Sequence, residues 1–168
     1  MVAPTQELRR FPEGIMTPVS TLQQAIGRLD IVVLDHVLRG VLDPRMRLLD
    51  AGCGAGRNLT ALLGLGFDVW GFDLDPAAVH HARHAVAQER PVWTGAQCDE
   101  RVRHGSLERC PELFGPPDAP FDAVLCNAVL HFATVHAHFR AMIDGLRSML
   151  RPGGLLLCRL ATSHTIED

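Results

Sequence analysis

The chain has 168 residues, a length typical of a single domain, and 47% of them are hydrophobic, which is enough for a packed core. Its net charge is −3, with acidic and basic residues scattered along the sequence, so no basic surface of the kind that binds nucleic acid is predicted. No apolar run is long enough to span a membrane, and residues 1–11 lack the apolar stretch of a signal peptide. Five cysteines without Cys-x-x-Cys spacing favour reduced thiols in a cytoplasmic protein.

Residues 1–18 carry three prolines and little periodicity, and we interpret them as an irregular arm that precedes one domain at residues 19–168. A helix is expected to begin at Ser20 or Thr21 and to end near Gly40. Its apolar positions recur at helical spacing, at Leu22, Ile26, Leu29, Val33 and Val37. This pattern predicts a helix that packs one face against a sheet.

The following segment has the pattern of a buried strand, a glycine turn and a helix. Residues 45–50 form the predicted strand, Gly52, Gly54 and Gly56 the turn, and residues 58–65 the helix. Glycines at alternate positions let the backbone bend tightly and leave no Cβ between the chain and a ligand. The free N–H groups at the start of the helix favour polar or anionic ligand groups in that space.

A second predicted strand, at residues 67–72, ends in an acid. Asp73 follows it, and a carboxylate at a strand end beside a glycine loop suits a hydrogen bond to a ribose diol. Together the two strands indicate a ligand that contains a nucleoside. Asp75 then caps a helix that has Pro76 at its first position and runs to about Gln88.

That helix contains two histidines one turn apart, His80 and His84, which is a spacing found in metal sites. No third ligand stands nearby in the sequence. We therefore interpret them as part of a solvated helix face and predict no metal.

The second half of the chain continues the alternation of strands and helices. In order, we expect a polar connection at residues 89–100, a weak edge strand at 101–104, a loop with at most a short helix at 110–120, a strand at 121–127, a helix at 133–150, a turn at 151–154 and a strand at 155–160. The sequence predicts an α/β fold with a mainly parallel sheet.

The spacing of the glycines narrows the choice of cofactor. A dinucleotide site has a third glycine at the position of Arg57, and a P-loop has a lysine that is missing here. The segment from Leu49 to Gly56 instead resembles the first motif of the class I S-adenosylmethionine-dependent methyltransferase family. Three further segments resemble that family: Gly-Phe-Asp-Leu-Asp-Pro at 71–76, Phe-Asp-Ala-Val at 121–124 and Arg-Pro-Gly-Gly at 151–154.

The resemblance implies a Rossmann-like three-layer sandwich with strand order 3-2-1-4-5. The family's usual C-terminal β-hairpin has no counterpart before residue 168. We therefore expect a chain truncated at its C-terminus, with an exposed sheet edge that invites a homodimer.

The resemblance also implies S-adenosylmethionine as the cofactor, with S-adenosylhomocysteine as the product. Family members commonly place an acid where Ser106 stands, to receive the adenine amino group, and a serine hydroxyl can accept the same bond more weakly. Leu107 would supply a backbone N–H and apolar cover to the base. The full set of expected cofactor-binding residues is Asp50, Gly52, Cys53, Gly54, Gly56, Asn58, Asp73, Leu74, Ser106, Leu107 and Asn127.

Methyl transfer of this kind is an in-line displacement, in which an enzyme mainly aligns the reacting atoms. The residues at 127–130 lack the Asn/Asp-Pro-Pro-aromatic segment of DNA and protein-glutamine methyltransferases, which favours a small-molecule acceptor. His131 follows the fourth strand on the ligand face and is the candidate for acid–base chemistry or substrate contact. Its alternative is a structural contact with Phe132. His136 and His138 are weaker candidates.

Two other functions stay open. The first is a binding module that keeps the cofactor pocket without catalysing a reaction. The second is a nucleotide-dependent oxidoreductase domain, which Arg57 and the lack of a second nucleotide-binding half disfavour.

Overall fold

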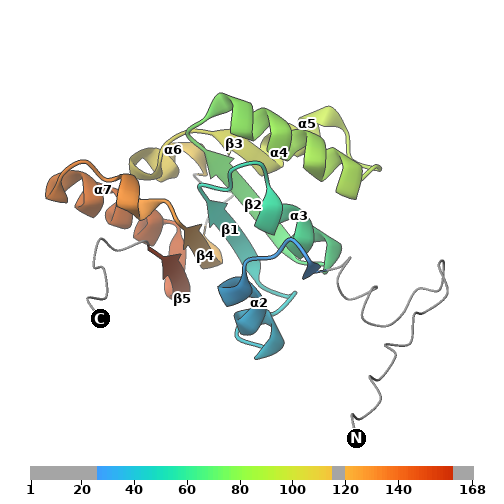
Figure 1. Ribbon diagram of the computed structural model, residues 1–168, viewed down its shortest axis with the longest axis horizontal. Coiled ribbons are helices and arrows are strands. Elements are labelled where there is room, and N and C mark those ends of the chain that lie inside the picture. The colour runs from blue at the N-terminus through green and yellow to red at the C-terminus, as the bar shows by residue number, and fades with distance from the viewer. Residues whose placement is uncertain (1–25, 115–119, 161–168) are drawn as a thin grey trace, which may run out of the picture.

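The computed structural model describes residues 26–114 and 120–160, which form one twisted sheet with helices on both faces (Figure 1). The five strands are parallel and stand in the order β3-β2-β1-β4-β5, which confirms the predicted fold class and strand order. Their bounds are β1 Arg47–Ala51, β2 Asp68–Asp73, β3 Val102–His104, β4 Phe121–Asn127 and β5 Leu150–Arg159.

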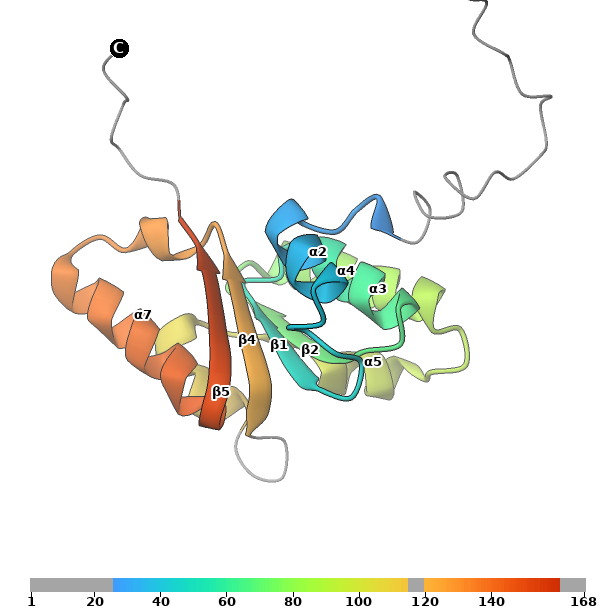
Figure 2. The ribbon, with the colours of Figure 1, turned by 90° about the horizontal axis from the view of Figure 1, so that it is seen from below.

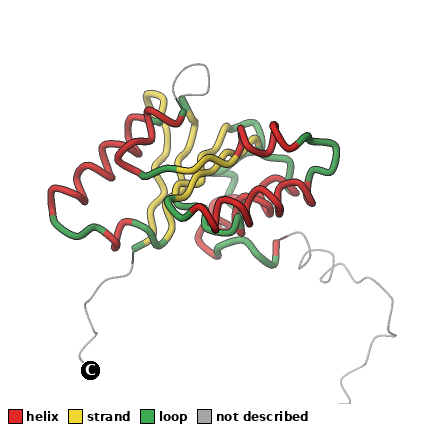
Figure 3. Tube along the Cα trace, turned by 90° about the horizontal axis from the view of Figure 1, so that it is seen from above, coloured by secondary structure: helices red, strands yellow, loops and turns green. Residues whose placement is uncertain are grey.

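The helices divide into two layers, which Figures 2 and 3 show from opposite sides. α7 and α6 pack on one face of the sheet, and α2, α3 and α4 lie on the other. The bounds are α2 Ile31–Leu38, α3 Arg57–Gly64, α4 Pro76–Glu89, α5 Gly95–Arg101, α6 Cys110–Leu113 and α7 His136–Ser148, with short 3₁₀ turns η1 at Leu107–Arg109 and η2 at Leu130–Phe132. No helix within the described ranges is long and apolar enough to cross a membrane.

The strand β1 is central and buried on both faces. Leu48 packs into the core under α3, and the next residue, Leu49, packs into the core under α7. Successive side chains of a strand point to opposite faces, so a strand covered on both sides is apolar throughout. The exception is Asp50, which is only 2% exposed and lies at the carboxyl end of the strand.

The helix predicted from residue 20 to residue 40 is interrupted at residues 27–30, and its last part is confirmed as α2, which ends next to Gly40 as expected. Residues 27–30 form a turn, and α2 begins afresh with Asp30 as its N-cap, whose Oδ1 accepts the Val32 N–H at 3.0 Å. Leu29 and Val33 are buried as expected. An aspartate side chain competes well for free backbone N–H groups, and this competition divides the apolar pattern into two pieces. The arm predicted at residues 1–18 lies outside the described residues.

The polar connection predicted at residues 89–100 contains the helix α5. Thr94 and Gln97 form a capping box, in which each side chain accepts the other residue's backbone N–H. That signature stands in the sequence as Thr-x-x-Gln. The Asp75 cap of α4 and its Pro76 are confirmed, with Asp75 Oδ1 2.9 Å from the Ala77 nitrogen.

Two boundaries in the C-terminal part differ from the prediction. α7 begins at His136 rather than at residue 133, because residues 133–135 follow the turn η2 outside any helix and the N-cap Val135 has an extended backbone. The turn predicted at 151–154 belongs to β5, which already pairs Leu150 with Phe121 and then shifts register before Leu155. β5 pairs only with β4 and is therefore an edge of the sheet within the described residues.

One glycine sets how closely α7 approaches the segment after β3. A Cβ placed on Gly145 would lie 2.0 Å from the Leu107 carbonyl oxygen, so no side chain fits there. The helix and η1 therefore meet at backbone contact in the second half of α7, at Leu107 and Glu108.

Candidate functional site

A pocket of about 470 Å³ lies at the carboxyl ends of the strands, where open parallel sheets place their ligands. Its size is typical of a site for a small molecule or cofactor. Its lining comes from the loops after β1 to β4 and from α7: Gly52, Asp73, Leu74, Asp75, Ser106, Leu107, Glu108, Asn127, Ala128, Val129, Phe132, His138 and Met142.

The Asp73 carboxylate organises the floor of this pocket. Its Oδ2 accepts the Gly54 N–H at 2.8 Å, and its Oδ1 accepts the Asp75 N–H at 2.9 Å. Each carboxylate oxygen has further acceptor capacity, so the group can still bind a diol. The acid predicted from the sequence therefore lies between the glycine loop and the start of α4, where a nucleoside ribose would need it.

The glycine loop brings the main chain close to Val129 on the opposite wall of the pocket. A Cβ on Gly52 would lie 2.4 Å from Val129 Cγ2, while a Cβ on Gly54 would meet no atom within 4 Å. Both residues have positive φ angles, 74° and 55°. Gly56, with φ of 86°, packs against Ala82 of α4 and starts α3. The loop thus leaves space where a ligand can approach the main chain.

Asp50 and Asn58 are buried, and Asn127, which lines the pocket, is half-buried. Asn58 uses its Oδ1 to accept the Asp30 N–H at 2.9 Å. Asp50 Oδ2 and both amide atoms of Asn127 have no hydrogen-bond partner among the described residues. Buried polar atoms are almost always paired in native proteins, so these atoms fit a site that is completed by polar groups of a ligand.

Burial has a large effect on Asp50. Desolvation raises its pKa to about 7, and the positive charge of Arg57 and a hydrogen bond from Asn58 offset only part of this effect. The neighbouring Cys53 thiol is also buried, and burial, followed by the charge of Asp50, raises its pKa well above the usual value. A thiol in that state is a poor nucleophile. Cys53 therefore contributes packing behind the loop.

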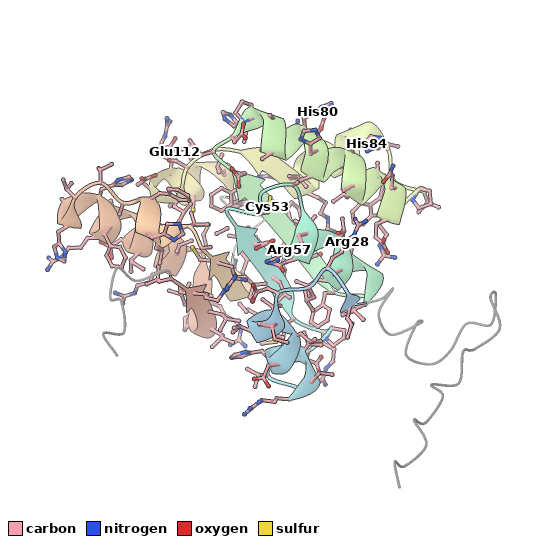
Figure 4. The ribbon with its side chains drawn as sticks, in the orientation of Figure 1. Arg28, Cys53, Arg57, His80, His84 and Glu112 are labelled. Carbon is pink, nitrogen blue, oxygen red and sulfur yellow. The ribbon has the colours of Figure 1, made fainter. Side chains whose placement is uncertain are left out.

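The charge of the pocket lining favours some ligands over others. Asp73, Asp75 and Glu108 line it, and within the described ranges no lysine or arginine does. Arg57, at the position of the missing third glycine, points to Asp30 instead, with Nη2 3.2 Å from Oδ2 (Figure 4). The same oxygen accepts Arg159 Nη2 at 2.7 Å. Such a lining disfavours the pyrophosphate of a dinucleotide and suits a ligand with positive charge.

His131 lies outside this pocket. It lines a neighbouring cavity of about 400 Å³ with Leu130, Ala133, Val135, His136, Phe139 and Leu160. The ring of His131 packs against Phe132 in a tilted arrangement with 4.4 Å between the ring centroids, and Phe132 itself lines the first pocket. The turn η2 therefore separates the two cavities, with His131 on one side and Phe132 on the other.

His80 and His84 are exposed on the outer face of α4 (Figure 4). Where the structure describes the chain, no group of three or more His, Cys, Asp or Glu side chains is placed to hold a metal ion. The five cysteines are free thiols, four of them buried.

Sequence reasoning missed about half of the pocket lining. The missed residues are Asp75, Glu108, Ala128, Val129, Phe132 and Met142, while His138 was named only as a weaker candidate. Asp75 could have been included because it is two residues from Asp73. Glu108 and Met142 gave no signal, because they reach the pocket through the packing of α7 on η1.

Comparison with known proteins is consistent with this geometry. The profile of a family described as "Methyltransferase domain" matches residues 49–156. The ubiquinone biosynthesis O-methyltransferase of Xanthomonas campestris pv. campestris (strain B100) is 34% identical over 134 residues, which are 80% of this chain and 51% of that protein. The tRNA 5-carboxymethoxyuridine methyltransferase of Escherichia coli (strain K12) is 28% identical over 148 residues, 88% of this chain and 51% of that protein. The chain thus spans about half the length of these relatives.

A solved structure shows the same architecture. The magnesium protoporphyrin IX methyltransferase (ChlM) of Synechocystis PCC 6803, with bound SAM (S-adenosylmethionine), superposes with a TM-score of 0.54 at 26% identity. The match covers 82% of this chain and 61% of that one.

The raised pKa of Asp50 predicts a pH-dependent stability. An acid with a folded pKa near 7 and an unfolded pKa near 4 stabilises the fold most below pH 4, and this contribution is lost as the pH rises through 7. From pH 5 to pH 8, the free energy of unfolding should therefore fall further in the wild type than in Asp50→Asn, whose side chain does not titrate. The expected difference between the two losses is about 2–3 kcal/mol.

Urea denaturation of both proteins at the two pH values measures this difference, and the histidine titrations common to both cancel. A direct check is the carboxyl ¹³C titration of Asp50. Equal losses in the two proteins, or a carboxyl midpoint near 4, would contradict the prediction.

Proposed function

Because this chain belongs to the class I S-adenosylmethionine-dependent methyltransferase family, we propose that its carboxyl-edge pocket binds S-adenosylmethionine and that the protein transfers the methyl group to a small-molecule acceptor. The observation that supports this most is the lining of that pocket. A glycine loop, a strand-end aspartate and orphaned buried polar atoms stand together there, with carboxylates and no lysine or arginine within the described residues.

We assign different parts of the cofactor to different residues of the pocket. In this proposal Asp73 accepts the ribose hydroxyls, and Leu107 and Leu74, which line the same pocket, cover the base. Asn127 and Asp50 offer buried polar atoms to the amino acid portion, which has both charges. When bound, the cofactor supplies an electrophilic methyl group on a sulfonium. The three acids of the lining lower the energy of that positive charge.

We place the acceptor on the Phe132 side of the pocket. Phe132 is 70% exposed at the rim, and the neighbouring cavity behind η2 is lined by apolar side chains and two histidines. These surroundings fit a small, partly aromatic acceptor that the side chains hold in line with the methyl group. A ubiquinone-pathway relative makes such an acceptor plausible. The expected exclusion of nucleic acid has no such support, because another relative is named for tRNA.

We also propose a cellular location and an oligomeric state for the protein. We expect a cytoplasmic protein, and we expect the free edge of β5 to pair with a second copy of the chain. Multi-angle light scattering of the purified chain tests the homodimer, and a strictly monomeric species would contradict it.

Removal of the Asp73 carboxylate should weaken cofactor binding. Asp73→Ala is expected to reduce the affinity for S-adenosylhomocysteine by about 1.5–3 kcal/mol, the usual range for a hydrogen bond to a charged group. Titration calorimetry measures it, with NAD as a second ligand that the wild type should not bind. The matched control is Asp144→Ala, an exposed aspartate on α7 that lies outside the pocket. Unchanged affinity in the Asp73 variant would contradict the ribose assignment.

A substitution at His131 separates acceptor chemistry from cofactor binding. His131→Ala should lower the turnover number and leave S-adenosylhomocysteine affinity intact, because the ring lies in the neighbouring cavity. General acid–base catalysis typically contributes about 10²–10⁴-fold. A loss of that size supports a chemical role, and His84→Ala on α4 serves as the control.

A turnover number of the His131 variant within about threefold of the control would mean that His131 has no role in the chemistry and only packs against Phe132. Cofactor binding with no turnover on any acceptor would favour the idle binding module instead.

A further inference from the structure

A smaller pocket, of about 250 Å³, lies at the amino-terminal end of β2. Asp68, the first residue of that strand, lines it, whereas Asp73, the last residue, lines the pocket at the carboxyl ends of the strands. The two pockets therefore stand at opposite edges of the sheet, as the course of β2 in Figure 1 shows. They share no lining residue.

The walls of this second pocket are largely apolar. Leu63 at the end of α3 and Phe67 just before β2 are buried, and Trp93 is half-buried. Val92 also lines the pocket, although its side chain is 85% exposed. An apolar wall that extends to an exposed valine suits a ligand with an apolar body.

The charged side chains of the lining are two arginines, Arg90 and Arg101, and one acid, Asp68, which leaves one positive charge in excess. Asp68 is already shared, because it pairs with Arg101 and lies with Oδ2 3.5 Å from Arg47 Nε. Arg90 donates through Nη2 to the neutral carbonyl of Leu63, and its buried Nε has no hydrogen-bond partner among the described residues. Buried N–H groups without an acceptor are rare, so this end of the pocket suits an anionic oxygen.

Aromatic rings hold the arginines of this region in place. The guanidinium carbon of Arg101 lies 4.4 Å from the ring centre of Trp70 and 5.1 Å from that of Trp93. The guanidinium of Arg47 lies 4.7 Å from the Trp70 ring. Cation–π contacts of this kind restrict the guanidinium groups. A restricted guanidinium loses less freedom when it binds a planar carboxylate through two parallel hydrogen bonds.

We propose that this pocket is a second ligand site, which binds a small aromatic carboxylate. The carboxylate group lies at Arg90 and Arg101, and the ring packs against Trp93 and the apolar wall of Leu63 and Phe67. A carboxylate has the single negative charge that the lining lacks, and the small volume limits the ligand to about one ring. The proposal is independent of the cofactor, because the two pockets have no residue in common.

The test is a titration of the purified chain with three probes, followed by ¹H–¹⁵N NMR. Benzoate is the ligand, benzamide is its neutral isostere, and inorganic phosphate is an anion without a ring. The chain has two tryptophans, and both contact Arg101, so their two indole N–H signals report on this pocket. Benzoate should shift them and saturate at least roughly tenfold more tightly than either other probe, the range for a hydrogen bond to a charged group.

Removal of the Arg90 charge should weaken this binding. Arg90→Gln is expected to lower the benzoate affinity roughly tenfold or more, because the amide loses the charge-assisted hydrogen bonds to the carboxylate. The matched control is Arg39→Gln, which removes the same charge from an exposed arginine that pairs with Asp35 on α2. The control should bind benzoate as the wild type does.

Val92→Glu tests the same site without touching the core, because the side chain is exposed. A negative charge at the mouth of the pocket should repel the carboxylate and lower the benzoate affinity roughly fivefold, which corresponds to about 1 kcal/mol for two charges close together in water. The matched control is Leu38→Glu, at a position on α2 that is 73% exposed and lies outside the pocket. If Arg90→Gln does not fold, this pair of variants decides alone.

Three results would overturn the proposal. The first is the absence of any shift of the indole signals with benzoate. The second is equal binding of benzoate and either other probe, which would show that the ring or the charge is not recognised. The third is a loss of affinity in Arg90→Gln or Val92→Glu no larger than in its control. None of these results bears on S-adenosylhomocysteine binding, which tests the proposed function separately.

Discussion

The site depends on one hydrogen-bonded junction between the first two strands. Asp73 Oδ2 accepts the Gly54 N–H, and the Gly52 and Cys53 N–H groups donate to the Phe72 carbonyl at 2.9 and 3.0 Å. The loop after β1 is thereby tied to the end of β2. Parallel strands bring these ends together without any local sequence contact between residues 52 and 73, so the junction is a property of the sheet. The pocket floor forms only when both strands are in register.

The parts of this junction that lie within one segment of the chain could be predicted from the sequence. The glycine turn, the strand-end acid and the Asp75 cap follow from local rules of backbone conformation and capping. β4 matches its predicted bounds because its residues form one apolar run between two turn signals. Strand order followed from the family resemblance rather than from any local pattern.

The rest could not be predicted, for two physical reasons. The side chains of Asp30 and Thr94 cap α2 and α5 and so determine where these helices begin. In the sequence, the apolar periodicity around Asp30 and the polar residues around Thr94 concealed these two caps. At Glu108 and His138, the contact joins residues on two elements that meet only because Gly145 lets α7 approach η1. Single-sequence patterns report the periodicity of an element, and they do not report which elements touch. The catalytic-face candidate His131 shows the same limit, since η2 turns its ring into a separate cavity.

The two ends of the pocket differ in whether their polar groups are already paired. At the Asn127 end, polar atoms are buried without partners, and Asp50 is kept near neutrality by desolvation, so this end gains most when a charged ligand group arrives. At the Glu108 end, the Glu108 carboxylate is already paired with His138, whose other ring nitrogen accepts the Thr134 N–H, so these groups are oriented before a ligand binds. Preorganised groups cost little reorganisation on binding, and they reject a ligand whose donors are misplaced. In the proposed function, the strand ends bind the charged portion of the cofactor, and the close contact of α7 with η1 holds the opposite end of the pocket in place.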